Sequence, residues 1–487
     1  MVKNNYLYFL VTIIYIVIRI LTINNCFFWD NIQQVSKEAY WFYLTNFRDF
    51  FISKTNVPDG ISATGYHAPL MGMMTALLWK ILGYKLWVHH LFIAFWAIIL
   101  SYNIKKMLSV LFPKEYIALI LTIILLESTL LSQFAVSSPD FILFTAFVIA
   151  LRAIIFNKKG LLTIAVFFLC CINMRGVFAG IILYVSHQYY LFLQNNGSFN
   201  FKKSFSITLP YIPTFIILTS YYTFYLISNG WFFSDSSYST HYMMPESFFQ
   251  VVKHLVEFTL RSVENGRIVI WILSFYFLFK FVRSKTVLSH ELKAFMLMFI
   301  LFNGLYLIFV FISRMPFSSR YFLPQFFLLT VFTLHGITTF FTPKKIKLAF
   351  MLIIFAQTTG HLWIYPDKIA KPWDTTLGHL TYYDLREECF EYIDANNINY
   401  NDISAGFCLY GNRRFIELIN EDKIVHHEKN RQYFLYSNIS NVEDELINEF
   451  EDGNKWQLIK TFKKGFVFIK IYKNLSNNTN NKVVNSN

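Results

Sequence analysis

Long apolar segments recur along the first three quarters of this chain. One crossing of a bilayer requires about 20 helical residues, and segments of this kind are too numerous for a soluble core of the same size. Their positions predict about eleven membrane-spanning helices, near residues 6–23, 86–103, 116–135, 139–156, 160–174, 176–193, 206–228, 267–283, 293–313, 320–342 and 347–365. The first segment carries only Arg19 as a charge and precedes no small-residue cleavage site, so we interpret it as a retained helix and not as a signal peptide.

Basic residues indicate which loops face the cytoplasm. Lysine and arginine are retained in short cytoplasmic loops more than in exported ones. Here they gather in alternate loops, at Lys105, Lys106 and Lys114, Lys158 and Lys159, Lys202 and Lys203, Arg283, Lys285 and Lys293, and Lys344, Lys345 and Lys347. The amino terminus is therefore expected inside the cell, and residues 24–85, 229–266 and about 366–487 outside it. The net charge of +13 follows mainly from this topology, so a nucleic-acid partner is not expected.

Composition supports the same fold class. Of the 487 residues, 55% are hydrophobic and 20% are aromatic, which exceeds what a soluble core needs. We therefore predict an α-helical polytopic protein of the bacterial inner (plasma) membrane, with a transmembrane domain over residues 1–365. Residues 366–487 combine charged stretches with strand-like runs such as 465–472, and they predict a small mixed α/β extracytoplasmic domain with a disordered, asparagine-rich tail. Only Cys389 and Cys408 are placed to pair in this domain, and their spacing does not show that they do.

The first predicted exported loop, residues 24–85, holds the most distinctive polar residues. Asp30 follows Trp29 directly after a membrane helix, which puts a carboxylate at the membrane surface. Apolar residues then recur at spacings of three and four over residues 35–51 and predict an interfacial helix, with Ser36, Lys37 and Glu38 on its polar face. A second apolar stretch is too short to span. It opens with Gly65-Tyr66-His67-Ala68-Pro69-Leu70 and ends near Trp79, Lys80, Lys85 and Trp87, where headgroups are expected.

The order of these elements resembles that of the glycosyltransferases of the C fold, which include protein O-mannosyltransferases and bacterial lipid A aminoarabinose transferases. The resemblance covers residues 1–365 and continues in three later motifs. These are Ser138-Pro139-Asp140-Phe141 at a helix start, the Arg175-Gly176 break between two helices, and Ser319-Arg320-Tyr321-Phe322-Leu323-Pro324, which is similar to an Arg-Tyr-x-x-Pro helix start. Two positions depart from the family's pattern. Asn31 follows Asp30 where members often have a second acid, and Ala68 follows His67 where members often have His-Pro-Pro.

The resemblance implies a membrane glycosyltransferase that moves a sugar from a polyprenyl-phosphate donor to an acceptor glycan, lipid or protein on the extracytoplasmic face. This reaction needs a base for the incoming nucleophile and cations for the departing phosphate. Asp30 is the predicted general base, with Glu38, Asp59 and Asp140 as the next candidates. Arg320 is the main predicted phosphate ligand, and the further substrate-binding candidates are Tyr321, Arg175, Lys80, Lys85, Asp140 and His67. No second carboxylate nucleophile is evident, which favours inversion at the anomeric carbon.

Simpler roles stay open for these residues. Asp30 also fits a solvated loop acid, Arg320 a headgroup anchor, and His67 a structural residue. Asp140 follows Pro139 at a helix start, where an acid complements the helix dipole. The sequence alone does not choose between these roles and the chemical ones.

Two other residues also allow two interpretations. Glu127 lies inside a predicted span, where it either packs helices together or contacts substrate. Trp373, in the stretch 371–377 after the last helix, either closes over the cavity or binds the acceptor on one interpretation, and anchors the tail at the membrane interface on the other.

The histidines of the chain do not indicate a metal site, and three other functional classes compete with the transferase. No cofactor is predicted, and a divalent metal ion is left open. His89-His90 and His426-His427 lack the ligand spacing of a zinc site, while His241 lies in the second exported loop. The competing classes are a lipid-linked sugar flippase or other transporter, an oligosaccharide polymerase or ligase, and a membrane scaffold. The chain shows no matched internal repeats, which disfavours transport.

Overall fold

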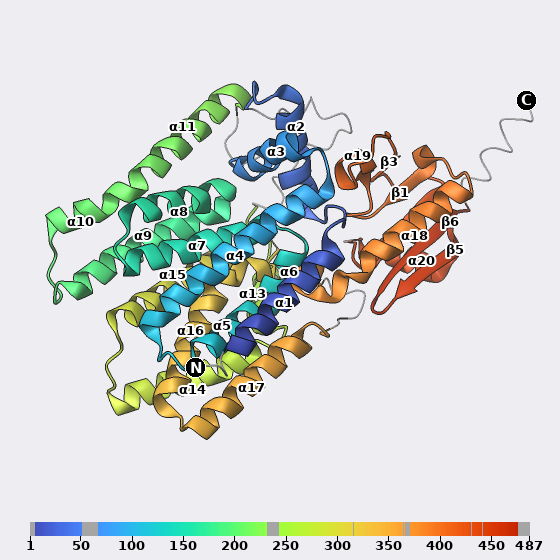
Figure 1. Ribbon diagram of the computed structural model, residues 1–487. Coiled ribbons are helices and arrows are strands. Elements are labelled where there is room, and N and C mark those ends of the chain that lie inside the picture. The colour runs from blue at the N-terminus through green and yellow to red at the C-terminus, as the bar shows by residue number, and fades with distance from the viewer. Residues whose placement is uncertain are drawn as a thin grey trace, which may run out of the picture.

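The computed structural model describes residues 5–50, 67–230, 243–314, 316–363, 365, 371–429, 431–440 and 442–475. Asp59 and His241, named above, lie outside these described residues. A bundle of helices makes up most of the structure, and a smaller region with a β-sheet lies against one end of it (Figure 1). We name this end the site end and residues 371–475 the C-terminal sheet region.

Most helices of the bundle overlap the predicted apolar runs, whereas α13 (Phe248–Val263) lies in the segment 229–266 that was expected to be a loop. The helices are α1 (Asn5–Thr22), α4 (Leu86–Leu111), α5 (Ile117–Leu125), α6 (Ser128–Ala135), α7 (Pro139–Ile155), α8 (Lys159–Ile172), α9 (Met174–Gln194), α10 (Phe201–Thr208), α11 (Ile212–Asn229), α13 (Phe248–Val263), α14 (Ile268–Ser284), α15 (His290–Ile312), α16 (Leu323–Phe340) and α17 (Pro343–Gly360). Among the described helices, four are long and apolar enough to cross a membrane, or up to six if each of two bent pairs is one span. The number of eleven crossings stays a prediction.

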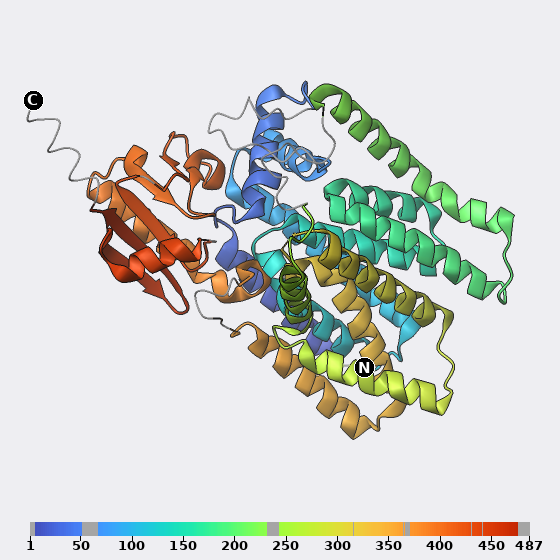
Figure 2. The ribbon, with the colours of Figure 1, turned by 180° about the vertical axis from the view of Figure 1, so that it is seen from behind.

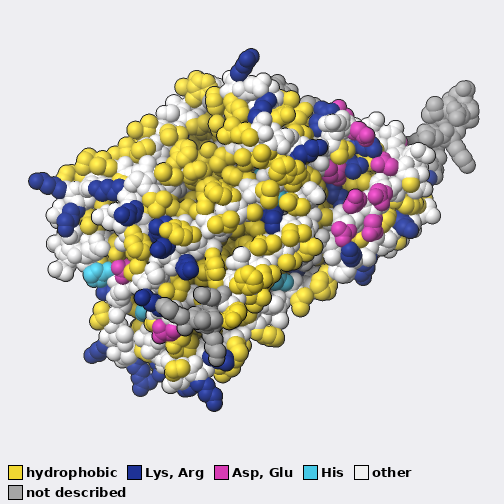
Figure 3. Space-filling model, in the orientation of Figure 1, with side chains coloured by type: hydrophobic (Ala, Val, Ile, Leu, Met, Phe, Trp, Pro, Cys, Tyr) yellow, Lys and Arg dark blue, Asp and Glu magenta, His cyan; other side chains and the backbone are white. Residues whose placement is uncertain are grey.

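The surface of the bundle is largely apolar. Large hydrophobic side chains are exposed along α4, α11 and α14, and apolar atoms cover much of the face drawn in Figure 3. Acidic side chains gather instead on the C-terminal sheet region (Figure 3). The predicted cytoplasmic lysines at 202–203 and 344–347 lie in the first turns of α10 and α17. The starts of both helices lie at the end of the bundle away from this region (Figure 1). A membrane around the bundle would therefore leave the sheet region outside its apolar layer.

One predicted span, residues 116–135, is not a continuous helix. Helices α5 and α6 meet at an angle of 61°. The helix is interrupted at Glu127, whose side chain caps α6 by accepting a hydrogen bond of 2.7 Å from the Leu130 amide. A second bend of 89° separates α13 from α14, where Asn265 and Gly266 adopt φ angles of 57° and 85°. The two bends contact each other, because Arg267 at the second bend pairs with Glu127 at the first.

The segment between α1 and α4 lies along the site end. It contains the π-helix η2 (Ile32–Lys37), α2 (Glu38–Thr45) and the short α3 (Leu70–Leu82). The polar face predicted for the interfacial helix is covered at three positions, because Ser36, Lys37 and Glu38 are all buried. Helix α3 packs closely on one side, since a Cβ at Gly72 would lie only 2.5 Å from the Glu38 Cβ. Helix α19 (Arg413–Ile416) covers another side, where Ser36 donates a 2.5 Å hydrogen bond to the Phe415 carbonyl.

The C-terminal sheet region has the mixed α/β structure expected of the tail. It begins with two 3₁₀ turns, η7 (Trp373–Thr375) and η8 (Leu377–His379), and continues into α18 (Thr381–Ala395). Its four-stranded sheet has the order β1-β4-β6-β5, in which β1 (Ile403–Ala405) and β4 (Tyr433–Ser437) pair in parallel and β6 (Val467–Asn474) and β5 (Trp456–Lys464) complete it in antiparallel fashion. The short strands β2 (Gly411–Asn412) and β3 (Ile424–Val425) form a separate pair, and α20 (Asp444–Asp452) precedes β5.

This region is packed against the bundle and not merely tethered to it. Its apolar core includes Phe28 and Val136 from the site end. Cys389 and Cys408 are both buried and free. The view from behind shows the same arrangement, with the sheet region against the site end (Figure 2).

Candidate active site

Five charged side chains from distant parts of the sequence meet at the site end. Arg320, on the 3₁₀-helix η6 (Ser319–Phe322), lies at the centre of the group. Its Nη1 atom is 2.7 Å from a carboxylate oxygen of Asp374, its Nε atom is 3.5 Å from one of Asp140, and its Nη2 atom pairs with Asp30. Arg175 in turn pairs with Asp140 at 2.6 Å. We name these five residues the Arg320 cluster.

The turn after α1 aims Asp30 at this cluster. Trp29 adopts a left-handed conformation with a φ of 50°, and the next residues enter η2. Asn31 is buried and donates a 2.7 Å hydrogen bond to the Val136 carbonyl. An ionised acid at that position has no proton to donate to a carbonyl. Asn31 stands where family members often have a second acid. Its hydrogen bond to Val136 gives it a packing role.

Two helix starts position Asp140 and Arg175. Ser138 caps α7 by accepting a 3.1 Å hydrogen bond from the Asp140 amide, and Pro139 occupies the first turn. Asn173 caps α9 and also donates to Asp140 at 3.3 Å. Asp140 thus accepts from both Arg175 and Asn173 on one carboxylate oxygen. Its role at the helix start and its place in the cluster are compatible with each other.

Tyr321 and His67 border the cluster. The Tyr321 ring lies 4.1 Å from the Arg175 guanidinium carbon and 5.3 Å from that of Arg320, so both cations face one aromatic ring. His67 is buried, and its Nδ1 atom accepts a 3.1 Å hydrogen bond from the Met174 amide at the start of α9. Burial and the nearby Arg175 lower the pKa of His67 to about 3. The imidazole is therefore neutral at neutral pH.

The three carboxylates have different environments. The Asp30 side chain is 35% exposed, against 5% for Asp140 and 2% for Asp374. Burial alone would raise the pKa of Asp30, but the guanidiniums of Arg320 and Arg175 hold it below its usual range. Burial, together with the charges of Asp30 and Asp140, raises the pKa of Asp374 despite its pairing with Arg320. With three carboxylates and two guanidiniums, the fully ionised cluster carries one net negative charge.

Two solved structures have a fold similar to that of this chain. The structure matches ArnT from Cupriavidus metallidurans bound to undecaprenyl phosphate with a TM-score of 0.52 at 10% sequence identity, covering 95% of this chain and 97% of ArnT. The apo state of the same ArnT matches with a TM-score of 0.52 at 11% identity and the same coverage. This chain has the ArnT fold. The likeness agrees with the fold that the sequence resemblance predicted. No protein-family model matches the chain, and a comparison with curated proteins gives no match.

Three other sequence candidates lie apart from the cluster. Lys80 is exposed on α3 and lies 4.2 Å from the centre of the Tyr43 ring. Lys85 precedes α4 and is also exposed. Among the residues that the structure describes, neither lysine pairs with a carboxylate of the cluster, and their phosphate contact stays a prediction. Glu38 is enclosed between α2 and α3, where burial raises its pKa well above the usual range.

The described residues include no group of three or more His, Cys, Asp and Glu side chains that could hold a metal ion. The three aspartates of the cluster are instead arranged around a guanidinium. His89 and His90 are buried and hydrogen-bonded within the bundle: Ser137 contacts both rings, and Arg19 contacts that of His90. Their structural role follows from these contacts.

Sequence reasoning missed Asp374. Asp374 belongs to the stretch 371–377, in which Trp373 was the residue expected to close over the cavity, bind the acceptor or anchor the tail. Trp373 is buried in the sheet region and donates a 2.9 Å hydrogen bond to the Asn438 carbonyl. The indole fixes the turn to the sheet region, and the next residue reaches the Arg320 cluster.

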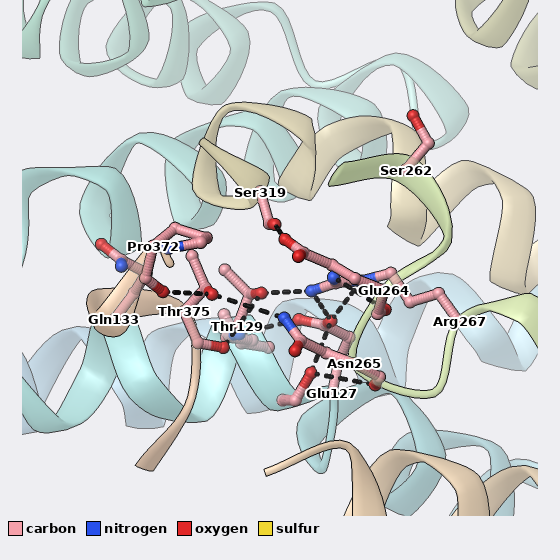
Figure 4. Close-up of polar contacts among 12 residues, drawn as sticks. Glu127, Thr129, Gln133, Ser262, Glu264, Asn265, Arg267, Ser319, Pro372 and Thr375 are labelled. Atoms are coloured by element: carbon pink, nitrogen blue, oxygen red, sulfur yellow. Dashed lines mark hydrogen bonds and ion pairs between the residues drawn. The ribbon is translucent and has the colours of Figure 1, made fainter. Parts of the chain in front are cut away.

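A second buried polar network, also missed, joins α6, the bend between α13 and α14, and Ser319 (Figure 4). Arg267, at the start of α14, donates to Glu127 at 2.9 and 2.5 Å and also contacts Thr129. Glu264 accepts from Arg261 at 3.0 Å and from the hydroxyl of Ser319, the neighbour of Arg320. Glu127 therefore packs helices together, one of the two roles left open for it. No local pattern indicates this network, because its ion pair joins residues that are 140 positions apart.

Proposed function

We propose that this protein is a membrane glycosyltransferase that transfers a sugar from a polyprenyl-phosphate donor to an acceptor on the extracytoplasmic face. The observation that carries the proposal is the Arg320 cluster, which joins a partly exposed carboxylate to two guanidiniums at the site end of an ArnT fold. An ArnT of this fold has been solved with undecaprenyl phosphate bound. The proposed donor is thus a sugar on a carrier of the same chemical class.

In the proposed reaction, an acceptor hydroxyl or amine attacks the anomeric carbon of the sugar. The bond from that carbon to the phosphate oxygen breaks, and the polyprenyl phosphate leaves with the electron pair. Asp30 takes the proton of the acceptor, because it is the most exposed of the three carboxylates and is held ionised. Arg320 and Arg175 neutralise the departing phosphate, for which a guanidinium offers two-point geometry. A single displacement of this kind inverts the anomeric centre.

The roles proposed for the bordering residues follow from their contacts. Tyr321 holds the two guanidiniums over its ring. Neutral His67 lies beside Asp30 and Arg175 and orients the acceptor or the phosphate. Lys80 and Lys85 lie on the loop that would meet lipid headgroups, and they are proposed as outer contacts for the carrier.

The test measures binding of undecaprenyl phosphate to the purified, full-length protein. Arg320→Ala removes a charge-assisted contact of about 1.5–3 kcal/mol, so affinity should fall by about ten- to a hundredfold. Arg320→Lys should recover only part of it, because the point charge survives and the fork does not. Arg314→Ala serves as the matched control, since Arg314 pairs at 2.6 Å with Glu246 and not with the cluster. Thermal unfolding confirms that each variant is folded, and equal affinity in all four proteins would refute the proposal.

A flippase would share the carrier but not the chemistry. In vesicles that contain a radiolabelled polyprenyl-phosphate sugar, transfer moves the label from the carrier to a new glycoside. Transport leaves the labelled lipid intact and changes only its leaflet. Label that remains on the carrier while crossing the membrane would replace the transferase proposal with the transporter one.

A further inference from the structure

Side chains of helix α6 bind the backbone at the start of the C-terminal sheet region. Thr129, Ser132 and Gln133 lie on one face of α6, since residues three and four apart are neighbours on a helix. They donate hydrogen bonds to three successive carbonyls in residues 374–376. Thr129 reaches the carbonyl of residue 375 at 3.3 Å, Ser132 that of 376 at 3.0 Å, and Gln133 that of 374 at 2.7 Å. All six residues are buried (Figure 4 shows Thr129, Gln133 and Thr375).

This arrangement fixes the Asp374 side chain on Arg320. One carboxylate oxygen of Asp374 lies 2.7 Å from the Arg320 Nη1 atom. The other, Oδ1, is buried and has no hydrogen-bond partner among the described residues. The second polar network supports the same turn, because Asn265 donates to the Thr375 hydroxyl at 3.4 Å. The sheet region therefore supplies a side chain to the proposed donor site, and that side chain occupies the cation that the donor needs.

Binding of a phosphate adds a negative charge to a cluster that is already negatively charged. The ionised cluster already carries one net negative charge, and a phosphodiester adds another beside Arg320. Anions at this distance in a buried site favour uptake of a proton by one of them. Asp374 is the least exposed of the three carboxylates. Burial and the two other aspartates already raise its pKa, whereas that of Asp30 is lowered.

We infer that Asp374 is the counter-ion that releases Arg320 to the donor phosphate and takes up a proton as the donor binds. The inference rests on the proposed function. The charged or titratable groups around the Asp374 carboxyl are Arg320 on η6, Asp30 after α1, Asp140 on α7 and Tyr383 on α18. Gln133 is the neutral contact on α6, with its amide 3.5 Å from the carboxylate. Protonated Asp374 keeps its place on α6, since its backbone carbonyl and not its carboxylate holds the turn there.

The experiment measures proton uptake during binding. The probe is the methyl diester of undecaprenyl phosphate, whose single charge does not titrate near neutral pH. Calorimetric titrations in buffers of different ionisation enthalpy count the protons taken up, between about pH 6 and about pH 9. The proteins are the parent, Asp374→Asn, Asp374→Glu and the control Asp384→Asn, which removes an exposed acid of α18 that pairs with Lys464 at 2.5 Å.

The parent should take up about one proton, and its affinity should fall by about tenfold per pH unit where free Asp374 is ionised. Asp374→Asn should take up none and bind equally well across the range, and more tightly than the parent at the alkaline end. Asp384→Asn should behave as the parent does, and Asp374→Glu should keep the proton uptake, because it keeps a carboxyl group beside Arg320. A merely structural role for Asp374 would lower affinity at every pH without changing the proton count.

Two results would overturn the inference. The first is the same proton uptake in Asp374→Asn as in the parent. The second is no uptake by the parent at any pH, which decides the matter even if the asparagine variant does not fold. Failure of the parent to bind the probe at all would be a different result, because it overturns the proposed function and with it this inference.

Discussion

Replacing Asp30 by asparagine tests the proposed general base directly. The substitution keeps the size of the side chain and its ability to accept a hydrogen bond from Arg320, but it removes the capacity to take the acceptor's proton. General-base catalysis contributes about 10²–10⁴-fold, so turnover should fall by that factor, which corresponds to about 3–5 kcal/mol in the activation free energy. Donor binding should not weaken, because Arg320 loses one counter-ion and gains freedom to meet the phosphate.

The structure also sets how much stability the Asp30→Asn variant should lose. The Asp30 side chain is 35% exposed, so its ion pair with Arg320 is screened by solvent and contributes about 1 kcal/mol or less. Arg320 keeps Asp140 and Asp374 as partners. We therefore expect a folded variant with a nearly unchanged unfolding temperature. The large loss of turnover and the small loss of stability distinguish a base from a structural acid.

The assay follows transfer of a labelled sugar by the purified parent, Asp30→Asn and the exposed-acid control Asp384→Asn. The pH profile adds a second readout. Because the pKa of Asp30 lies below its usual range, this group should stay ionised, and turnover should not decline on its account, until the pH falls below about 4. Turnover of Asp30→Asn within about threefold of the parent would be far outside the range for a lost base and would remove Asp30 from the chemistry.

Three further outcomes are expected. A reporter fused after residue 365 should be active only outside the cytoplasm and one fused near Lys158 only inside, and the reverse pattern would put the site on the wrong face. Arg267→Met leaves Glu127 buried without its partner and should cost about 3–5 kcal/mol in unfolding free energy, with Glu127→Gln restoring part of it in the double variant; additive losses in denaturant titrations would contradict the pairing. Gly72→Ala should loosen the packing of α3 on α2, seen as faster proteolysis of the first loop, because its Cβ would lie 2.5 Å from a side-chain carbon of α2; unchanged proteolysis would show that the helices can separate at no cost.

Much of the helical architecture was predictable because it depends on local pattern. The apolar runs locate most of the helices, although α4 extends to Leu111, the run 116–135 is broken into two helices and α13 was not predicted. The four charged residues at predicted exported helix ends, Asp30, Asp140, Arg175 and Arg320, are near one another in the structure. Helix ends on one side of a membrane lie in the same thin layer, so polar residues at these ends lie close to one another.

The parts that escaped prediction depend on contacts between distant segments. Glu127 interrupts a helix that its neighbours favour, and its partner Arg267 is about 140 residues away. Ser36 and Glu38 occupy the polar face of an amphipathic pattern, yet other elements bury them. Periodicity shows only which residues share a face, and it cannot show that a second element will cover the opposite one.

The three acids that sequence reasoning offered as alternatives to Asp30 can be compared on their surroundings. Glu38 is enclosed between helices and favours its neutral form, which is poorly suited to a base. Asp140 is 5% exposed, and one of its oxygens already accepts from both Arg175 and Asn173. Asp59 lies outside the described residues. Asp30 has the same chemical group as Asp140 but is 35% exposed, so the environment and not the residue type supports its assignment as the base.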